Sequence, residues 1–434
     1  MPETGSEGAP GAFLFLQGPL TRFYAQIAER LMAMGRRVVR VNFCGADAAD
    51  WPHPGAIAYT GTPADWPAFL EQRIAPLGIA TVVLHGDRRF YHRHAAAWAR
   101  RHAITVAATE LGYLRPDWMT LERNACSARS HFPADRATIE AVAAAVPPLD
   151  ATPRFRASTP AMMAAEIRFT LYNRLMRHRF PHYRSHRPFG ARRVWPGWLA
   201  AQARAPLARR RGQRLMAALA ATGRRYFVLA LQLEGDFQLR DHSPFASVAE
   251  SIGHVAASFA RAAPPDSLLA IKPHPLDAAP RRRRREIEAA TAAHALGDRV
   301  AMVEGVAIDA LCRHAAGFVT VNSSAGFEAL AAGCPVATVM PTIYDCADLT
   351  HQGPLDAFWT APQGPDPALD TALRRALAGT IQVRGTLHDP AGRAAAASAI
   401  AERLAADQLN HPGAFADPPP RLARAAAMGV VYDD

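Results

Sequence analysis

Short apolar runs alternate with amphipathic helical patterns in the first part of this chain. The run from Ala12 to Leu16 is apolar throughout and is followed by Gln-Gly-Pro, which is typical of a buried parallel strand. Apolar residues then recur at three- and four-residue spacing between Leu20 and Met34, which predicts a helix before a second strand over Val38–Val41. The order returns with strands at Ala80–Leu84 and Ile104–Ala108. Repeated strand–helix–strand order predicts a Rossmann-like domain.

The same alternation resumes after a segment of different composition. Residues 133–223 are rich in Pro, Arg and His and contain helical stretches but no convincing strand, so we interpret them as a helical, basic connector. Five apolar runs then predict a second Rossmann-like domain over residues 224–410: Tyr226–Leu231, Leu268–Ile271, Val300–Val303, Gly317–Val321 and Pro335–Val339. The predicted fold class is α/β, with this domain and a first one over residues 1–132 facing a central cleft. Residues 411–434 are rich in Pro and Ala, and we expect a loosely ordered tail.

Length and composition fit two packed domains. A chain of 434 residues is too long for one ordinary core, and 50% hydrophobic with 20% charged residues indicates a globular protein. No apolar run approaches the roughly 20 residues that cross a bilayer, and Met1–Gly11 lacks the pattern of a signal peptide. The five cysteines have neither zinc-site nor disulfide spacing. We therefore expect a cytoplasmic protein with reduced cysteines.

The formal charge of +11 comes largely from arginine-rich stretches. The densest are residues 177–193, 209–214 and 281–285. Such patches can bind nucleic acid, anionic lipid or an acidic sugar nucleotide, and the alternative is ordinary solvated surface. No nucleic-acid-binding module or interleaved aromatic platform is recognisable, so we expect no nucleic-acid partner.

In doubly wound sheets, ligands bind beyond the carboxyl ends of the strands, so polar residues there are candidates for a site. Gln17 follows the first strand, where a tight turn is the alternative. Asp87 and Arg88 follow a later strand and could bind an acceptor or an anionic sugar, or could pair with each other. Glu110 stands where a strand leaves the sheet, a position suited to an acid or base with a raised pKa, unless Arg115 simply neutralises it.

The first strand of the second half leads into a loop with two carboxylates two residues apart, QLEGDFQ. Asp236 is the predicted nucleophile, because a carboxylate can form a covalent intermediate with a sugar. Gln232 and Gln238 in this loop are assigned to donor binding. Arg240 and His242 follow closely and are assigned to acceptor or sugar binding.

A loop after the strand at 268–271 reads Lys272-Pro273-His274-Pro275. The prolines stiffen the loop and fix the histidine beside the lysine. His274 can donate a hydrogen bond or a proton to a departing phosphate, although a lone histidine is more often structural. We assign Lys272 and Pro275 to donor binding.

A third loop in the second half opens a predicted helix over Gly326–Ala332. Asn322, Ser323 and Ser324 stand before this helix, where free N–H groups and hydroxyls can bind a phosphate. Glu328, one turn further, could meet a ribose. Ordinary serine N-capping is the alternative, and it is compatible with phosphate binding.

These motifs together resemble the capsular polysaccharide synthesis and export family, in its KpsS-type branch. In the first half they read QGP, RVNF, GD and E-x-GYLRPDWMTLE, and in the second half LQLEGDFQLRDHSPF, KPHPLD and VTVNSSAGFEAL. The resemblance extends from Phe13 to Trp359. Two positions depart from the usual family pattern, since Leu111 replaces a second acidic residue and His85 stands where an FGD motif has Phe.

The resemblance implies a GT-B glycosyltransferase that moves Kdo from CMP-Kdo to a phosphatidylglycerol-type lipid, with retention, to start the poly-Kdo linker of a capsule. It implies that His274 and Pro275 form a CMP-binding HP motif and that Ser323 and Ser324 lie near the CMP phosphate. The second domain would bind the nucleotide sugar and the first the acceptor. Glu110 is the rival of Asp236 as nucleophile.

The expected partners are CMP-Kdo, an anionic lipid acceptor and the inner face of the cytoplasmic membrane, with a second Kdo transferase and the capsule export complex as further candidates. No cofactor or metal is expected, because no DxD-like pair stands at a strand end. The alternative function is a non-catalytic adaptor of the capsule export machinery.

Overall fold

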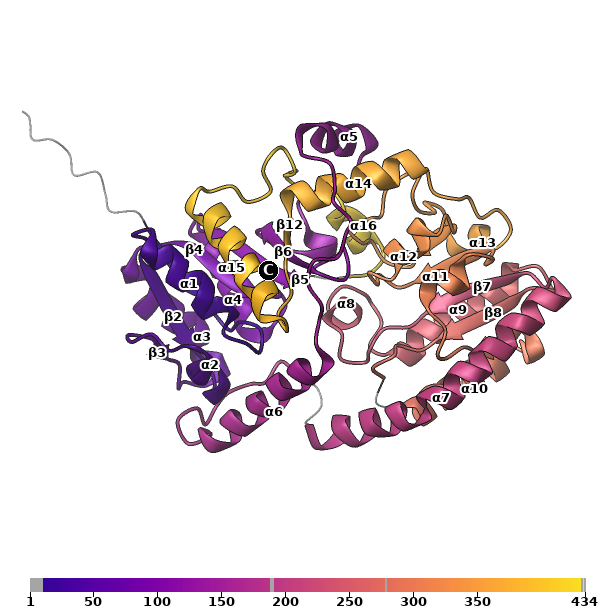
Figure 1. The fold of residues 1–434 in the computed structure, drawn as a ribbon, viewed down its shortest axis with the longest axis horizontal. Coiled ribbons are helices and arrows are strands. Elements are labelled where there is room, and N and C mark those ends of the chain that lie inside the picture. The colour runs from indigo at the N-terminus through magenta and orange to yellow at the C-terminus, as the bar shows by residue number, and fades with distance from the viewer. Residues whose placement is uncertain (1–10, 188–190, 278, 431, 433–434) are drawn as a thin grey trace, which may run out of the picture.

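The computed structural model describes residues 11–187, 191–277, 279–430 and 432, which form two α/β domains side by side (Figure 1). The first domain holds a seven-stranded sheet in the order β12-β6-β5-β4-β1-β2-β3. Its strands are β1 Ala12–Phe15, β2 Val38–Asn42, β3 Ile57–Ala58, β4 Ile79–His85, β5 Thr105–Leu111, β6 Trp118–Arg123 and β12 Gln382–Arg384. Strands β1 to β5 pair in parallel, whereas β6 and β12 are antiparallel to their neighbours.

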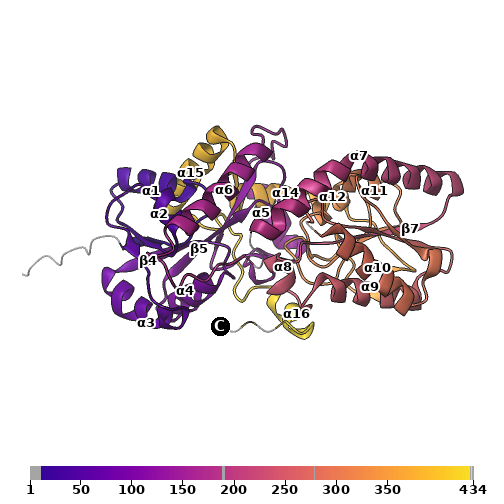
Figure 2. The same ribbon diagram turned by 90° about the horizontal axis from the view of Figure 1, so that it is seen from below.

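Helices cover both faces of this sheet, because alternate residues of β1 point to opposite sides. Phe13 and Phe15 pack beneath α1 (Phe23–Ala33) and α15 (Pro390–Ala405), while Leu14 packs beneath α3 (Trp66–Phe69) and α4 (Phe90–Arg101). Figure 2 shows α1 and α15 over one face and α3 and α4 over the other. Burial on both faces accounts for the continuous apolar run that predicted β1.

The second domain has a five-stranded, entirely parallel sheet in the order β11-β10-β7-β8-β9. Its strands are β7 Tyr226–Ala230, β8 Leu268–Lys272, β9 Val300–Met302, β10 Gly317–Thr320 and β11 Val336–Thr338. Its helices are α8 Phe237–Arg240, α9 Val248–Ala262, α10 Pro280–Ala293, α11 Ile308–Cys312, α12 Gly326–Ala331, α13 Leu355–Phe358 and α14 Pro367–Thr380. The expected α/β class with two Rossmann-like domains is confirmed.

The predicted boundary of the second domain at residue 410 is wrong, because the chain returns to the first domain after α14. Strand β12 pairs antiparallel with β6, with Val383 opposite Met119. Helix α15 then buries Ala396 and Ile400 in the same core as Phe23. Pairing between strands about 260 residues apart leaves no periodic signal near either strand, so the sequence pattern could not reveal it.

The connector predicted over residues 133–223 is helical, and its described residues contain no strand. Its helices are α5 Arg136–Ala145, α6 Thr159–Leu175 and α7 Ala191–Thr222, with the short α2 Gly45–Asp50 of the first domain packed against α6. Helix α5 buries Ile139 and Val142 against Leu369 and Leu373 of α14. This part of the connector therefore belongs to the core around the second domain.

The expectation of a loosely ordered tail over 411–434 is wrong for its described residues. Arg421, which precedes α16 (Leu422–Ala427), is buried and donates hydrogen bonds to the carbonyl oxygens of Phe132 at 2.7 Å and Ile343 at 2.7 Å. Ala414 and Ala425 have no exposed surface. Small alanine side chains fit the crowded surface of both domains, so an Ala-rich composition here reflects packing rather than disorder.

Candidate active site

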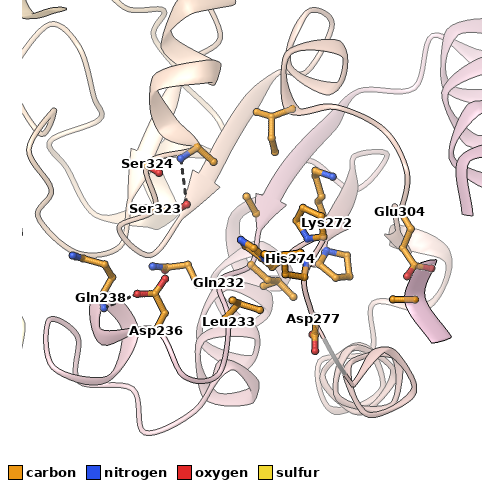
Figure 3. A pocket seen from close by; sticks show the side chains of 18 of the residues that line it. Gln232, Leu233, Asp236, Gln238, Lys272, His274, Asp277, Glu304, Ser323 and Ser324 are labelled. Atoms are coloured by element: carbon orange, nitrogen blue, oxygen red, sulfur yellow. Dashed lines mark hydrogen bonds between the residues drawn. The ribbon is translucent and has the colours of Figure 1, made fainter. Parts of the chain in front are cut away.

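A cavity of about 1380 Å³ lies between the two domains. Its walls are the segments after β4 and β5 on the first domain and the loops after β7, β8, β9 and β10 on the second, with parts of α6, α7 and α10. Figure 3 shows side chains of the second-domain loops turned toward this space, including Asp236, His274 and Ser324. The carboxyl ends of parallel strands from both sheets thus meet at one cavity, as predicted for the cleft.

Glu110 lies at the end of β5 and lines the cavity. Burial raises the pKa of its carboxyl to about 8, with further increases from the charges of Asp87 and Asp236, while Arg89 opposes the rise. Gly86 has a positive φ of 71°, and a Cβ atom there would lie 3.1 Å from Oε1 of Glu110. Glycine at this position therefore leaves room for the carboxyl.

Asp236 begins the short helix α8 and faces the same cavity. Its Oδ1 accepts a 2.9 Å hydrogen bond from the backbone N–H of Gln238 (Figure 3). Burial raises the pKa of this carboxyl, whereas hydrogen bonds from Gln238 and Gln232 and the charge of Arg115 favour the ionised form. The predicted pair of acids is therefore brought together across the cavity, Glu110 from one domain and Asp236 from the other.

Hydrogen bonds between the side chains of predicted donor-binding residues connect the loops of the second domain. Nε2 of Gln232 donates to Oδ1 of Asn322 at 2.9 Å, and Nδ2 of Asn322 donates to the carbonyl oxygen of Gln238 at 2.7 Å. Nε2 of Gln238 donates to the hydroxyl of Ser127 in the first domain. Oε1 of Gln232 is buried and has no hydrogen-bond partner among the described residues.

His274 and Lys272 lie beside each other on the cavity wall after β8 (Figure 3). The backbone N–H of Leu276 donates to Nδ1 of His274 at 3.1 Å, so Nδ1 is an acceptor and the ring proton is on Nε2. Burial lowers the pKa of His274, and Lys272 lowers it further, although Asp277 opposes them. A neutral imidazole can donate one hydrogen bond to a phosphate, and the positive charge comes from Lys272.

Hydrogen bonds within the Ser323-Ser324 loop and from Tyr344 fix the conformation of this loop. Oγ of Ser323 accepts from the N–H of Ala325 at 3.2 Å, and the hydroxyl of Tyr344 donates to the carbonyl oxygen of Ser323 at 2.5 Å. Any Cβ at Gly326 would lie 2.1 Å from Oη of Tyr344. The N-cap of α12 is Ala325 and has no side-chain hydrogen bond, so the serines do not cap the helix; both serines and Glu328 line the cavity.

Arg115 also lines the cavity, and its guanidinium interacts with three carboxylates, Glu110, Glu328 and Asp236. It is therefore not a simple partner that neutralises Glu110. Arg115 and Pro275 line the cavity, together with every other residue predicted to be catalytic or to bind the donor.

Five predicted acceptor or sugar-binding residues lie outside the described lining of the cavity: Gln17, Asp87, Arg88, Arg240 and His242. Gln17 is buried and donates to the carboxylate of Asp47 at 3.2 Å, while its Oε1 accepts from Tyr183 and contacts Nδ1 of His186 at 3.2 Å. It supports His186, which lines the cavity, but does not itself face it.

The other four lie on the far side of the same loops. Asp87 and Arg88 are buried, and Nε of Arg88 lies 3.9 Å from Oδ1 of Asp241. Nδ1 of His242 lies 3.0 Å from the hydroxyl of Tyr432, and Arg240 is exposed to solvent. Neighbouring residues in a tight turn point in opposite directions, and the sequence does not say which of them faces the ligand.

Five residues line the cavity without having been assigned to the site from the sequence: His85, Arg89, Tyr113, Ser127 and His186. His85 and Arg89 belong to the same motif as Asp87 and Arg88. The motif therefore does reach the cavity, but through His85 and Arg89 rather than through Asp87 and Arg88. His85 contacts the hydroxyl of Thr109 through Nδ1 at 3.0 Å. His186 lies in the connector, where no local pattern marks it as a site residue.

Across the described parts of the chain, no three His, Cys, Asp or Glu side chains form a cluster suited to one metal ion. In the same parts of the chain, no helix combines the length and apolar character needed to cross a bilayer.

Residues 80–388 match the family described as capsule polysaccharide biosynthesis protein. The chain is 33% identical over 381 residues to the capsule polysaccharide export protein KpsS of Escherichia coli, covering 87% of this chain and 96% of KpsS. It is 32% identical over 389 residues to the capsule polysaccharide modification protein LipB of Neisseria meningitidis, covering 86% and 91%. The solved structure of the beta Kdo 2,7 transferase KpsC of Thermosulfurimonas dismutans aligns with 92% of this chain and 99% of its own, with 13% identity and a TM-score of 0.42.

Proposed function

The chain belongs to the capsule polysaccharide biosynthesis family, and from this membership we propose that it is a retaining glycosyltransferase of capsule assembly. Its donor is CMP-Kdo and its acceptor is a phosphatidylglycerol-type lipid at the inner face of the cytoplasmic membrane. The identity of the sugar, the nucleotide and the lipid rests on the motif resemblance. A second Kdo transferase and the capsule export complex are its proposed partners.

One observation carries the proposal of an enzyme. Two carboxyl groups from different domains, Glu110 and Asp236, face one cavity that also contains a lysine, a neutral histidine and a serine-rich loop. A buried carboxyl with a strongly raised pKa is costly for stability and is common at catalytic sites. A non-catalytic adaptor needs no such arrangement. The arrangement therefore supports transferase activity over a role in export alone.

The donor phosphate is proposed to lie between Lys272, Nε2 of His274 and the Ser323-Ser324 loop. Lys272 supplies positive charge, and burial lowers its pKa while Glu328 and Glu304 oppose that effect. His274 supplies one N–H donor. These groups stabilise the charge that develops as CMP departs, without a metal ion.

Retention follows if Asp236 acts as the nucleophile. Its carboxylate attacks the anomeric carbon of Kdo, the bond from that carbon to the phosphate oxygen breaks, and CMP leaves with the electron pair. An acceptor hydroxyl then attacks the same carbon, and the bond to Asp236 breaks. Glu110 in its ionised form takes the hydroxyl proton. The alternative, in which Glu110 is the nucleophile, places the covalent sugar on the first domain instead.

The test incubates the protein with CMP-Kdo and a water-soluble lysophosphatidylglycerol analogue, with products read by mass spectrometry. We expect product from wild type, at least about 100-fold less from Asp236→Asn, and near-normal activity from Asp241→Asn. Asp241 is the matched control, because it lies in the same loop but outside the described cavity lining. Absence of product from wild type contradicts a transferase, and full activity of Asp236→Asn removes only the nucleophile.

The two candidate nucleophiles are separated by a second measurement. Glu110→Gln is incubated with CMP-Kdo alone, digested, and searched for a peptide carrying Kdo. A sugar on the peptide that contains Asp236 supports the proposed roles. Transfer at wild-type rate by Glu110→Gln contradicts a role for Glu110 as base or nucleophile.

A further inference from the structure

The positive charge of the chain is concentrated in one segment. Residues 151–222 contain fifteen arginines, one glutamate and no other acidic residue or lysine, a formal charge of +14. The whole chain has +11, so all other residues together carry −3. The single acid, Glu166, is paired with Arg187. The basic character of the protein therefore belongs to α6, α7 and the chain that joins them.

Helix α6 carries apolar side chains on its outer face as well as its inner one. Ala165 and Phe169 are buried against the first domain, where Arg168 also pairs with Asp50 at 2.6 Å. On the outer face, three aliphatic residues repeat every four positions with 45%, 49% and 58% of their surface exposed: Ile167, Leu171 and Leu175. Four-residue spacing aligns them in one stripe. A stripe of exposed aliphatic residues marks an interaction surface.

The stripe is flanked by exposed arginines. Arg174 and Arg177 are exposed at its C-terminal end, and no ion pair to either is present among the described residues. On α7, Leu207 is 50% exposed and lines the cavity together with Arg204 and Arg209. Aliphatic side chains bordered by arginine suit the boundary between the acyl chains and the headgroups of a bilayer.

Both helices also border the cavity. Met162 of α6 and Arg204, Arg209 and Arg211 of α7 are among its lining residues. In Figure 1, α6 runs along the lower edge of the first domain and α7 along the lower edge of the second. A flat anionic surface on this side would lie near both helices and near the cavity-lining residues that they carry.

We infer that the outer face of α6, defined by Ile167, Leu171, Leu175, Arg174 and Arg177, docks on an anionic lipid bilayer, with the cavity-lining arginines of α7 close to the lipid headgroups. The aliphatic stripe enters the interface, and the arginines attract the lipid headgroups with energies that add over many charges. A second copy of this chain is disfavoured as the occupant, because two segments that each have a formal charge of +14 repel each other. Nucleic acid is disfavoured as the occupant, because it would bind the arginines but would leave the aliphatic stripe exposed to solvent. Docking does not depend on the proposed function. Only the use of a docked lipid as the acceptor in the cavity rests on that function.

The test is flotation of the purified full chain with vesicles of phosphatidylglycerol and phosphatidylcholine, compared with phosphatidylcholine alone, without any sugar donor. We expect flotation that requires phosphatidylglycerol and weakens at high salt. The stripe variant Ile167→Ser/Leu171→Ser/Leu175→Ser should float at least about 10-fold less. The matched control is Met32→Ser/Met34→Ser, because both methionines are similarly exposed, at 41% and 46%, at the C-terminal end of α1. It should float as wild type does.

A second measurement, Kdo transfer to the water-soluble acceptor, tests the proposed function independently of membrane docking. The stripe variant should retain that activity, which also shows that it is folded. Equal flotation of wild type and stripe variant overturns the inference, as does flotation that is independent of phosphatidylglycerol. The inference is also overturned if wild type does not float but instead self-associates or binds RNA, and the stripe variant loses that self-association or RNA binding. Loss of flotation in the stripe variant supports the docking surface even where no Kdo transfer is detected.

Discussion

Glu110 and Asp236 lie on opposite domains and face one cavity, close enough for the charge of Asp236 to raise the pKa of Glu110. Burial has the largest effect on that pKa, and Asp87 the next. At Asp236, hydrogen bonds from Gln238 and Gln232 oppose the rise. Two carboxyls in such different surroundings can hold different protonation states, and Glu110 acts as the base in its ionised fraction, which grows as the pH rises toward about 8.

Glu110→Gln should make the folded protein less sensitive to alkaline pH. A carboxyl whose pKa is raised to about 8 holds its proton more tightly in the folded than in the unfolded chain, so stability falls as the pH rises from about 4.5 toward 8. Glutamine cannot ionise. Calorimetry should show that the Tm of the variant, relative to wild type, is higher at about pH 9 than at about pH 5, by roughly several degrees. A constant difference in Tm across this range contradicts the raised pKa.

Gly86→Ala should reduce transfer at least about 10-fold by moving Glu110, since a Cβ there would lie 3.1 Å from its carboxyl oxygen. Gly55→Ala is the control, because Gly55 also has a positive φ, 80°, but a Cβ there meets nothing within 4 Å. Both variants should lose about 1 kcal/mol of folding free energy through backbone strain. Similar activity in the two variants would show that the close approach to Glu110 is unimportant.

His274 should titrate below the ordinary histidine pKa of 6.5, because burial lowers its pKa. Asp277 raises that pKa, so Asp277→Asn should lower the midpoint further. NMR of isotope-labelled histidine measures both midpoints, with His274→Gln identifying the resonance. A midpoint at or above 6.5 in wild type would mean that His274 is charged near neutral pH and acts as an acid rather than as a neutral donor.

Arg421→Met should destabilise the fold by about 2–4 kcal/mol, because three backbone carbonyl oxygens lose a charged donor. These are the carbonyls of Phe132, Pro133 and Ile343, at 2.7, 3.0 and 2.7 Å. The control is Arg313→Met, which removes only an exposed pair with Asp309 and should cost less than about 1 kcal/mol. Denaturant unfolding measures both. Equal effects would show that Arg421 does not join the C-terminal segment to the two domains.

Much of the site was predictable because parallel strands share a direction. Asp236, His274 and Asn322 each follow a buried apolar run, and a parallel sheet brings the ends of such runs to one edge. The same reasoning selected Asp87 and Arg88, which are buried outside the described cavity lining, and overlooked Arg89 in the same motif. Direction within a turn depends on φ and ψ, as at Gly86, and residue type alone does not fix it.

The sequence by itself determined the two α/β domains, the order of strands and loops within each, and the chemical groups available at the strand ends. It did so because apolar periodicity and turn residues act over a few neighbouring positions. Only the tertiary structure decided that β12 and α15 complete the first domain, that Arg421 joins the C-terminal segment to both, and that Glu110 faces Asp236. These relationships depend on packing and pairing between residues 78 or more positions apart, which no local pattern encodes.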